Sequence, residues 1–276
     1  MSTDSVRVER QAERIGDLSS GDGQGSRSGW KYLALFLVVC AVVAGLAWGV
    51  DRLSTLNTVP ADTAEAMNAK ALAAVLQVEA DKEAEATAKR TTFIGDSYTT
   101  GTGASDPSKR WTAIVSKAQG WHQVNLGHGG TGYLKASTSG CGSTGCPNFA
   151  SMVQEAVATK PGRVVVTGGV SDFTSDIGEV EPMIQKTYAD LRAALPTTTI
   201  IAIGPPVIGD ATPKAADFDA AVRRAAESIG AQYISLADPD VLDESMTMFG
   251  NTQLNDAGHA AVAQRVLEAL PPVTSS

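Results

Sequence analysis

The chain has 276 residues, enough for one large domain or two small ones, and its formal net charge is −8. This acidic balance argues against a nucleic-acid-binding protein, which would normally carry a basic patch. Aromatic residues are few and only three cysteines are present. An α/β core is therefore favoured over an all-β sandwich, and a small domain held together by disulfides is excluded.

The N-terminal region predicts a tail and a membrane anchor. Residues 1–29 are polar and rich in Ser and Gly, which is typical of a disordered tail. Within the segment 30–50, residues 32–50 carry no charge and would extend about 28 Å as a helix, enough to cross a bilayer core. Basic residues Arg27 and Lys31 precede this run, which predicts a cytoplasmic N-terminus and an extracytoplasmic remainder.

Cleavage of the apolar segment is the alternative. The sequence around Ala47 resembles a small-x-small signal-peptidase site, and cleavage there would release a secreted protein. The region before the apolar run is long for a signal peptide, which favours the uncleaved, single-pass anchor.

The segment 51–90 predicts a helical stalk or linker. Residues 61–90 are rich in Ala, Glu and Lys and contain no Gly or Pro, a strongly helical composition. Such a helix would reach about 45 Å. Its apolar stripe is weak, so it is interpreted as a spacer, a weak dimerising helix or a solvated linker.

From residue 91 to 276 short apolar runs alternate with amphipathic stretches. This alternation predicts a flavodoxin-like three-layer α/β/α domain with a five-stranded parallel sheet. Ligands bind such sheets beyond the C-terminal ends of the strands. The predicted strands are 92–94, 123–126, 163–167, 198–203 and 232–236, and the predicted helices are 110–119, 148–159, 178–194, 213–229 and 256–270.

Two short motifs carry the chemistry. Gly95-Asp96-Ser97 places a serine on a tight turn after the first strand, and Asp256 precedes His259 by three residues near the C-terminus. Together they can supply the nucleophile, base and orienting acid of acyl transfer. A structural turn or a phosphate-binding loop is the competing interpretation of the serine loop. The phosphate loop would require Gly-Lys-Ser/Thr, which is missing.

Four ordered blocks resemble the GDSL or SGNH hydrolase family over residues 92–270. They are the Gly-Asp-Ser loop, the glycine-rich loop 125–133, the loop 168–173, and Asp-x-x-His at 256–259. The resemblance implies that Ser97 is the nucleophile, His259 the general base and Asp256 the residue that orients His259. It also implies an oxyanion hole built from the backbone N–H groups of Ser97 and Gly130, with Gly129 as the fallback.

The third block departs from the family pattern. Ser171 stands where the family has an asparagine whose side-chain amide is a third oxyanion donor. A serine hydroxyl is shorter and reaches the oxyanion less directly. This departure predicts a slow enzyme, a substitute donor or a protein that is not an enzyme. Ser171 is equally well interpreted as an ordinary turn residue.

The remaining candidates surround these loops. Asp96, Tyr98, His128 and Asp172 are possible substrate contacts, and His122 is interpreted as a strand residue without chemistry. No Cys/His cluster has metal-ligand spacing, so neither a metal nor a cofactor is expected.

The expected state of each cysteine depends on the predicted membrane topology. Cys141 and Cys146 flank a glycine-rich loop outside the membrane and are expected to form a disulfide. Two free thiols in a cytoplasmic chain would overturn that topology. Cys40, within the apolar run, is interpreted as a small apolar residue.

The sequence therefore predicts an extracytoplasmic serine esterase that removes short acyl groups from an ester substrate. That substrate is a cell-envelope carbohydrate or a lipid, and nucleic acid is excluded as a partner. Two alternatives stay open, an O-acyltransferase acting on cell-envelope carbohydrate and a catalytically weakened binding module.

Overall fold

The computed structural model describes residues 36–46, 61–208, 213–248, 250 and 253–272. Residues 36–46 form a helix. In the described ranges, no helix combines the length and apolar character needed to cross a membrane. The predicted tail and both ends of the predicted span lie outside these ranges, at 1–29, 30–35 and 47–50.

Helix α3 (Ala61–Lys89) precedes the sheet. Its surface carries charged pairs one turn apart, such as Glu85 with Lys89 at 2.6 Å. Pairs of this kind give an exposed helix a small, salt-dependent stabilisation. By internal contacts the chain divides into residues 1–74 and 75–276, and the second unit holds the sheet.

Five parallel strands form the central sheet, in the order β2-β1-β3-β4-β5. This order is the flavodoxin-like arrangement, so the predicted fold class is confirmed for the sheet domain. The strand bounds are β1 (Arg90–Gly95), β2 (His122–Asn125), β3 (Arg163–Thr167), β4 (Thr199–Ile203) and β5 (Gln232–Ile234).

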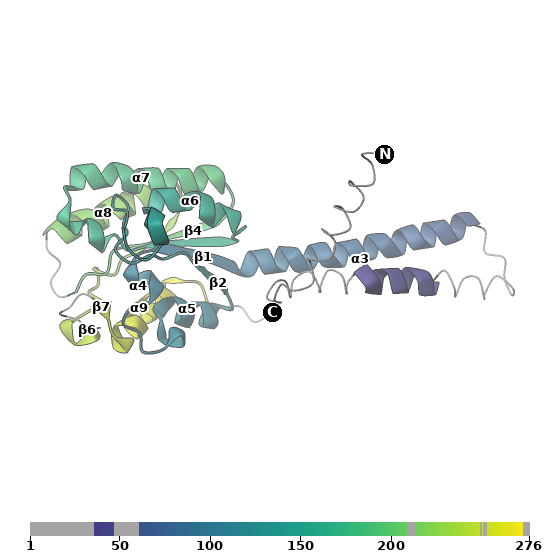
Figure 1. Cartoon of the computed structure of the whole chain (residues 1–276), viewed down its shortest axis with the longest axis horizontal. Helices are drawn as coiled ribbons and strands as arrows, with labels where there is room; N and C mark the ends of the chain where they lie inside the picture. The colour runs from purple at the N-terminus through teal and green to yellow at the C-terminus, as the bar shows by residue number, and fades with distance from the viewer. Residues whose placement is uncertain (1–35, 47–60, 209–212, 249, 251–252, 273–276) are drawn as a thin grey trace, which may run out of the picture. The chain divides into compact units, whose positions relative to one another are not determined.

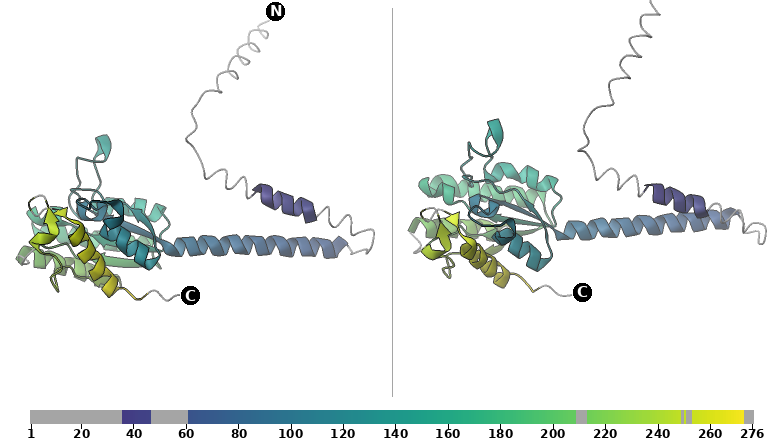
Figure 2. Two further views of the ribbon diagram at one scale, coloured as in Figure 1. Left: turned by 90° about the horizontal axis from the view of Figure 1, so that it is seen from below. Right: turned by 60° about the horizontal axis from the view of Figure 1, so that its bottom comes forward.

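Helices cover both faces of the sheet and complete the three layers (Figure 1). The first face packs against α6 (Phe149–Ala158), α7 (Ile177–Ala194) and α8 (Pro213–Ser228). The second face packs against α5 (Trp111–Gln119) and α9 (Asp256–Ala269). These last two helices lie side by side, as both views of Figure 2 show.

The central strands β3 and β4 bury side chains on both faces, which explains their nearly continuous apolar sequences. In β3, Val164 and Val166 belong to the core under α6–α8, whereas Val165 belongs to the core under α5 and α9. Strand β4 repeats this alternation. A shift of register by one residue would exchange the two cores, so the register is strongly specified.

The order in which strands are added to the sheet reverses at β1, because β2 lies on one side of β1 and β3 on the other. In open parallel sheets such a reversal opens a crevice at the C-terminal strand ends. The loops that follow β1, β2 and β3 meet there. They contain α4 (Ser97–Thr100), η2 (Gly142–Thr144) and η3 (Val170–Thr174).

The C-terminal region adds elements that the sequence does not predict. A two-stranded hairpin of β6 (Thr247–Met248) and β7 (Gln253–Leu254) follows the short helical turn η4 (Glu244–Met246), and β7 contacts α4. A further helical turn, η1 (Pro107–Lys109), lies against the first turns of α9.

Candidate active site

Ser97 begins helix α4 on a tight turn after β1. Asp96 caps this helix, with its Oδ1 accepting a hydrogen bond from the Tyr98 backbone N–H at 3.0 Å. A side chain at Gly95 would place Cβ 2.0 Å from Thr99 Oγ1 and 2.5 Å from the Thr167 carbonyl oxygen. Only glycine therefore allows the turn that presents Ser97, whose side chain is half-buried.

Asp96 links the turn after β1 to the turn after β3. It is 1% exposed, and its Oδ2 accepts a hydrogen bond from the Gly169 backbone N–H at 3.0 Å. Burial raises the pKa of Asp96 to about 6, although hydrogen bonds from backbone N–H groups partly oppose this shift. The carboxylate is thus enclosed by backbone. Its geometry is that of a positioning residue rather than the substrate contact considered from the sequence.

Tyr98, another residue considered as a substrate contact, is 6% exposed and packs in the core under α5 and α9. Its carbonyl oxygen accepts a hydrogen bond from the Trp111 indole N–H at 2.9 Å. The residue therefore anchors α4 to α5.

The glycine-rich loop after β2 lies against Ser97. Asn125 fixes its start by donating to the Thr99 carbonyl oxygen at 2.7 Å and accepting from the Gly127 N–H at 2.9 Å. A Cβ built on Gly129 would lie 3.8 Å from the Ser97 Cβ. Gly130 follows at a positive φ of 77°, and its nearest side chain is that of Ser137. Of the two glycines considered for the oxyanion hole, Gly129 is thus placed against the serine.

The loop after β3 reaches the glycine-rich loop through Asp172. This carboxylate is fully buried and accepts hydrogen bonds from the backbone N–H groups of Leu134 at 3.3 Å and Lys135 at 2.9 Å. Burial raises its pKa. Asp172 therefore clamps one loop to another, although the sequence suggested a substrate contact. Ser171, the neighbouring residue in η3, is half-buried.

His259 lies on α9 and is fully buried. Its Nε2 lies 3.3 Å from the Thr102 carbonyl oxygen, so this nitrogen carries the proton in that contact. Its Nδ1 is buried and has no hydrogen-bond partner among the described residues. Burial lowers the pKa of His259, while the Thr102 carbonyl and the Asp256 charge raise it to a lesser extent. The ring is therefore neutral near pH 7.

Asp256 is bound by Ser105 and Lys109, and the buried Nδ1 of His259 has no hydrogen bond to it. Asp256 accepts hydrogen bonds from the Ser105 N–H at 2.8 Å and the Ser105 hydroxyl at 2.7 Å, and it pairs with Lys109 Nζ at 2.6 Å. The hydrogen bond from Lys109 and those from Ser105 hold the pKa of Asp256 well below its usual range.

Asp256 and His259 both lie in the first turn of α9, and this turn is held firmly in place. Asn255 caps it by accepting from the backbone N–H groups of Ala257 at 2.9 Å and Gly258 at 3.1 Å. A Cβ on Gly258 would lie 2.5 Å from the Met246 carbonyl oxygen, so the helix start packs closely on η4. In this conformation His259 contacts Thr102, and Asp256 contacts Ser105 and Lys109. Among the described residues, no hydrogen bond links Ser97, His259 and Asp256 as a triad.

Four further residues shape this region, although no sequence motif contains them. Thr102, Ser105 and Lys109 hold His259 and Asp256. Gln253, in the strand that contacts α4, has a buried Oε1 without a hydrogen-bond partner in the described ranges. Thr102, Ser105 and Lys109 contact residues that are distant in the sequence, so no local motif indicates their role.

A flavodoxin-like sheet with a serine on the strand–helix turn after β1 and a glycine-rich loop beside it defines the class of SGNH-type hydrolase folds. Residues 93–261 match the model of the GDSL-like lipase/acylhydrolase family, and the chain belongs to this family.

Solved structures share this fold at low sequence identity. TesA is 16% identical with a TM-score of 0.54, and the match covers 66% of this chain and 98% of that one. A carbohydrate esterase family 2 enzyme from Corynascus thermopiles (Myceliophthora fergusii) is 20% identical with a TM-score of 0.52, covering 66% and 65%. Est24, a carbohydrate acetylesterase from Sinorhizobium meliloti, is 13% identical with a TM-score of 0.52, covering 64% and 96%. No curated protein matches the sequence.

Proposed function

We propose that the sheet domain hydrolyses carboxylic esters with Ser97 as its nucleophile. The observation that carries this proposal is the position of Ser97. It begins α4 at the reversal point of the sheet, on a turn that Gly95 permits and Asp96 locks, with Gly129 facing its Cβ. Membership of the acylhydrolase family supports the same reaction.

In the proposed mechanism, Ser97 Oγ attacks the acyl carbon and the ester alcohol leaves, giving an acyl-enzyme that water hydrolyses. The backbone N–H of Ser97, a second backbone N–H from the glycine-rich loop and the Ser171 hydroxyl stabilise the developing oxyanion. The family pattern assigns the second N–H to Gly130, and the position of Gly129 against Ser97 supports Gly129 as the alternative. His259 is the base that takes the Ser97 proton and returns it to the leaving alcohol. For this step the imidazole must exchange the Thr102 carbonyl for Ser97 Oγ, because Nε2 now donates to Thr102. The ring proton must also move from Nε2 to Nδ1, so that Nε2 is free to accept the Ser97 proton.

The substrate and location are also proposals. We infer a short acyl group, such as acetyl, on a cell-envelope carbohydrate. What supports the carbohydrate is that two of the similar folds belong to a carbohydrate esterase and a carbohydrate acetylesterase. What supports an extracytoplasmic location is the uncharged run at 32–50 together with the disulfide between Cys141 and Cys146.

Hydrolysis of p-nitrophenyl acetate by the full-length chain tests the catalytic roles. The Ser97→Ala variant is expected to fall to the rate of buffer alone. His259→Gln is expected to lose about 10²-fold or more in kcat/KM, whereas the control His122→Gln keeps the parent rate. Circular dichroism of each variant, and His259→Asn as a second substitution, separate a lost base from a lost fold. Full activity in a folded His259 variant would remove His259 from the mechanism, and full activity in Ser97→Ala would refute the proposal.

A catalytically weakened binding module is the second candidate, and the geometry of α9 favours it. His259 and Asp256 each bond to other partners, and Ser171 replaces an amide donor. This candidate predicts that an acetylated oligosaccharide binds equally well to the parent and to Ser97→Ala, with no hydrolysis by either. Transfer of acetyl to a carbohydrate acceptor faster than hydrolysis would instead identify an O-acyltransferase.

A further inference from the structure

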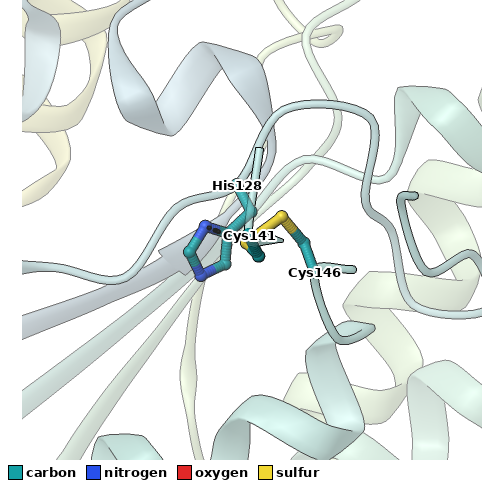
Figure 3. Close-up of side chains that lie close together, drawn as sticks. All are labelled: His128, Cys141 and Cys146. Carbon is teal, nitrogen blue, oxygen red and sulfur yellow. Dashed lines mark hydrogen bonds between the residues drawn. A yellow bond between two sulfur atoms is a disulfide. The ribbon is translucent and has the colours of Figure 1, made fainter. Parts of the chain in front are cut away.

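His128, Cys141 and Cys146 converge beside the glycine-rich loop (Figure 3). The Cys141 Sγ lies 3.3 Å from His128 Nδ1, and the two sulfur atoms are joined in a disulfide. All three potential ligand atoms lie within 4.8 Å of one another. Two sulfurs and an imidazole nitrogen at this spacing match the ligand types of zinc sites.

We propose that these three residues form a Zn²⁺ site that exists only when the disulfide is reduced. A dithiol reductant supplies two electrons and two protons, so the disulfide becomes two thiols and the reductant becomes a cyclic disulfide. Zn²⁺ then displaces the two thiol protons and binds both thiolates and His128 Nδ1. Three protein ligands leave the fourth tetrahedral position for a water molecule. The proposal does not depend on the role of Ser97.

The spacing of the cysteines fits this chemistry. Four residues separate Cys141 from Cys146, within the range of two to four that is typical of zinc-binding cysteine pairs. This differs from the expectation from sequence, which found no metal-ligand spacing, because His128 joins the two cysteines only through the fold. Bonds of about 2.3 Å from zinc to sulfur and about 2.0 Å to nitrogen place tetrahedral ligands roughly 3.5–4 Å apart. Cys141 Sγ and His128 Nδ1 lie close to that scale, at 3.3 Å, whereas the two sulfur atoms must move apart by side-chain rotation once their bond is broken.

Backbone contacts hold two of the ligands independently of the disulfide. Cys146 pairs with Ser137 through hydrogen bonds of 2.7 Å and 3.0 Å. The His128 N–H donates to the Gly95 carbonyl oxygen at 2.9 Å, which ties this residue to the end of β1. Reduction therefore leaves the backbones of His128 and Cys146 held in place, and these contacts do not include Cys141.

The disulfide is accessible to a small reductant. Cys141 and His128 are half-buried, and only Cys146 is buried, at 3% exposure. The segment around η2, between the two cysteines, stands out from the body of the domain (Figure 2). Neither a reductant nor a metal ion has to open the sheet to reach these sulfur atoms.

The test uses the full-length chain carrying Cys40→Ser, because Cys40 is an exposed free thiol. The protein is reduced with a dithiol, desalted without oxygen and titrated with Co²⁺ as a spectroscopic probe, followed by Zn²⁺. We expect one Co²⁺ per chain with a thiolate-to-cobalt charge-transfer band, and stoichiometric displacement by Zn²⁺. The oxidised protein is expected to show no such band.

Two single variants assign the ligands. His128→Ala keeps both thiols and is expected to weaken Zn²⁺ binding by at least about tenfold. His122→Ala, which removes an exposed histidine outside the cluster, is expected to leave the affinity unchanged. Absence of metal binding by the reduced parent would overturn the proposal, as would equal affinity of His128→Ala and the parent.

Discussion

At the scale of single residues, two glycines of the site differ in whether a side chain would fit at their positions. Gly95 cannot carry a side chain, because its Cβ would meet Thr99 and the Thr167 carbonyl oxygen. Gly129 has room for one, since the nearest atom to its Cβ is Ser97 Cβ at 3.8 Å. The first therefore shapes the turn, and the second shapes the space above Ser97.

We expect Gly95→Ala to lower the free energy of unfolding by about 1–3 kcal/mol, the usual cost of overpacking. Gly129→Ala should leave this free energy within about 0.5 kcal/mol of the parent while lowering kcat/KM, because the added methyl group narrows access to Ser97. Urea unfolding of both variants, with esterase rates for Gly129→Ala, distinguishes these effects. Equal stability of the two variants would show that the turn tolerates a side chain.

Ser171 is tested by restoring the amide. An asparagine at position 171 carries a longer donor than serine, and one oxyanion donor contributes about 10²–10³ in rate. We therefore expect Ser171→Asn to raise kcat by about tenfold or more, with little change in KM. An unchanged or lower kcat would mean that another group already occupies this donor position.

The raised pKa of Asp96 makes stability depend on pH. Its folded pKa of about 6 exceeds the reference value of 3.8, so the folded state favours the protonated carboxyl. This contribution is complete below about pH 4 and is lost as pH rises to 6. A difference of about two pKa units corresponds to about 3 kcal/mol.

The Asp96→Asn variant removes this titration. The stability of the parent relative to Asp96→Asn should therefore fall by about 3 kcal/mol between pH 4 and pH 7. Urea unfolding of both proteins at several pH values measures this difference. A constant difference across that range would show that Asp96 titrates normally in the folded protein.

At the scale of elements, Asp172 joins η3 to the glycine-rich loop. Because the carboxylate accepts hydrogen bonds from two partly buried backbone N–H groups, Asp172→Ala removes the acceptor of both. Each such group costs about 1–3 kcal/mol, so a loss of about 2 kcal/mol or more is expected in urea unfolding. Asp172→Asn, which keeps one acceptor oxygen, should lose less. Equal losses for the two variants would contradict the clamp.

The elements also show what the sequence could and could not indicate. Strands β3 and β4 were predictable because burial on both faces makes their sequences apolar with little interruption, as in Val164 to Val166. Strands β6 and β7 have two residues each, too few to produce a periodic pattern. The ends of helices and strands differ from the prediction by one or two residues, which is the usual uncertainty of fraying.

The candidate site was less predictable than the fold. The position of Ser97 follows from local sequence, because Gly95 and Asp96 define its turn. The orientation of His259 depends on Thr102, and that of Asp256 on Ser105 and Lys109. Contacts between segments about 150 residues apart leave no periodic signal in a single sequence.

At the scale of the whole molecule, the sheet brings together loops that the sequence separates widely. The loops after β1, β2 and β3 share one end of the sheet, and hydrogen bonds of Asp96, Asn125 and Asp172 join them. The cluster of His128, Cys141 and Cys146 adjoins the same loops. The proposed ester site and the proposed thiol-dependent metal site therefore lie at the same end of the domain.

Covalent labelling of the full-length chain by a fluorophosphonate shows whether Ser97 is a reactive nucleophile. We predict a single adduct on Ser97, identified by mass spectrometry of the labelled peptide. The adduct should disappear in Ser97→Ala and persist in Ser151→Ala, which removes an exposed serine on α6. Absence of an adduct on Ser97 in the folded parent would contradict the claim.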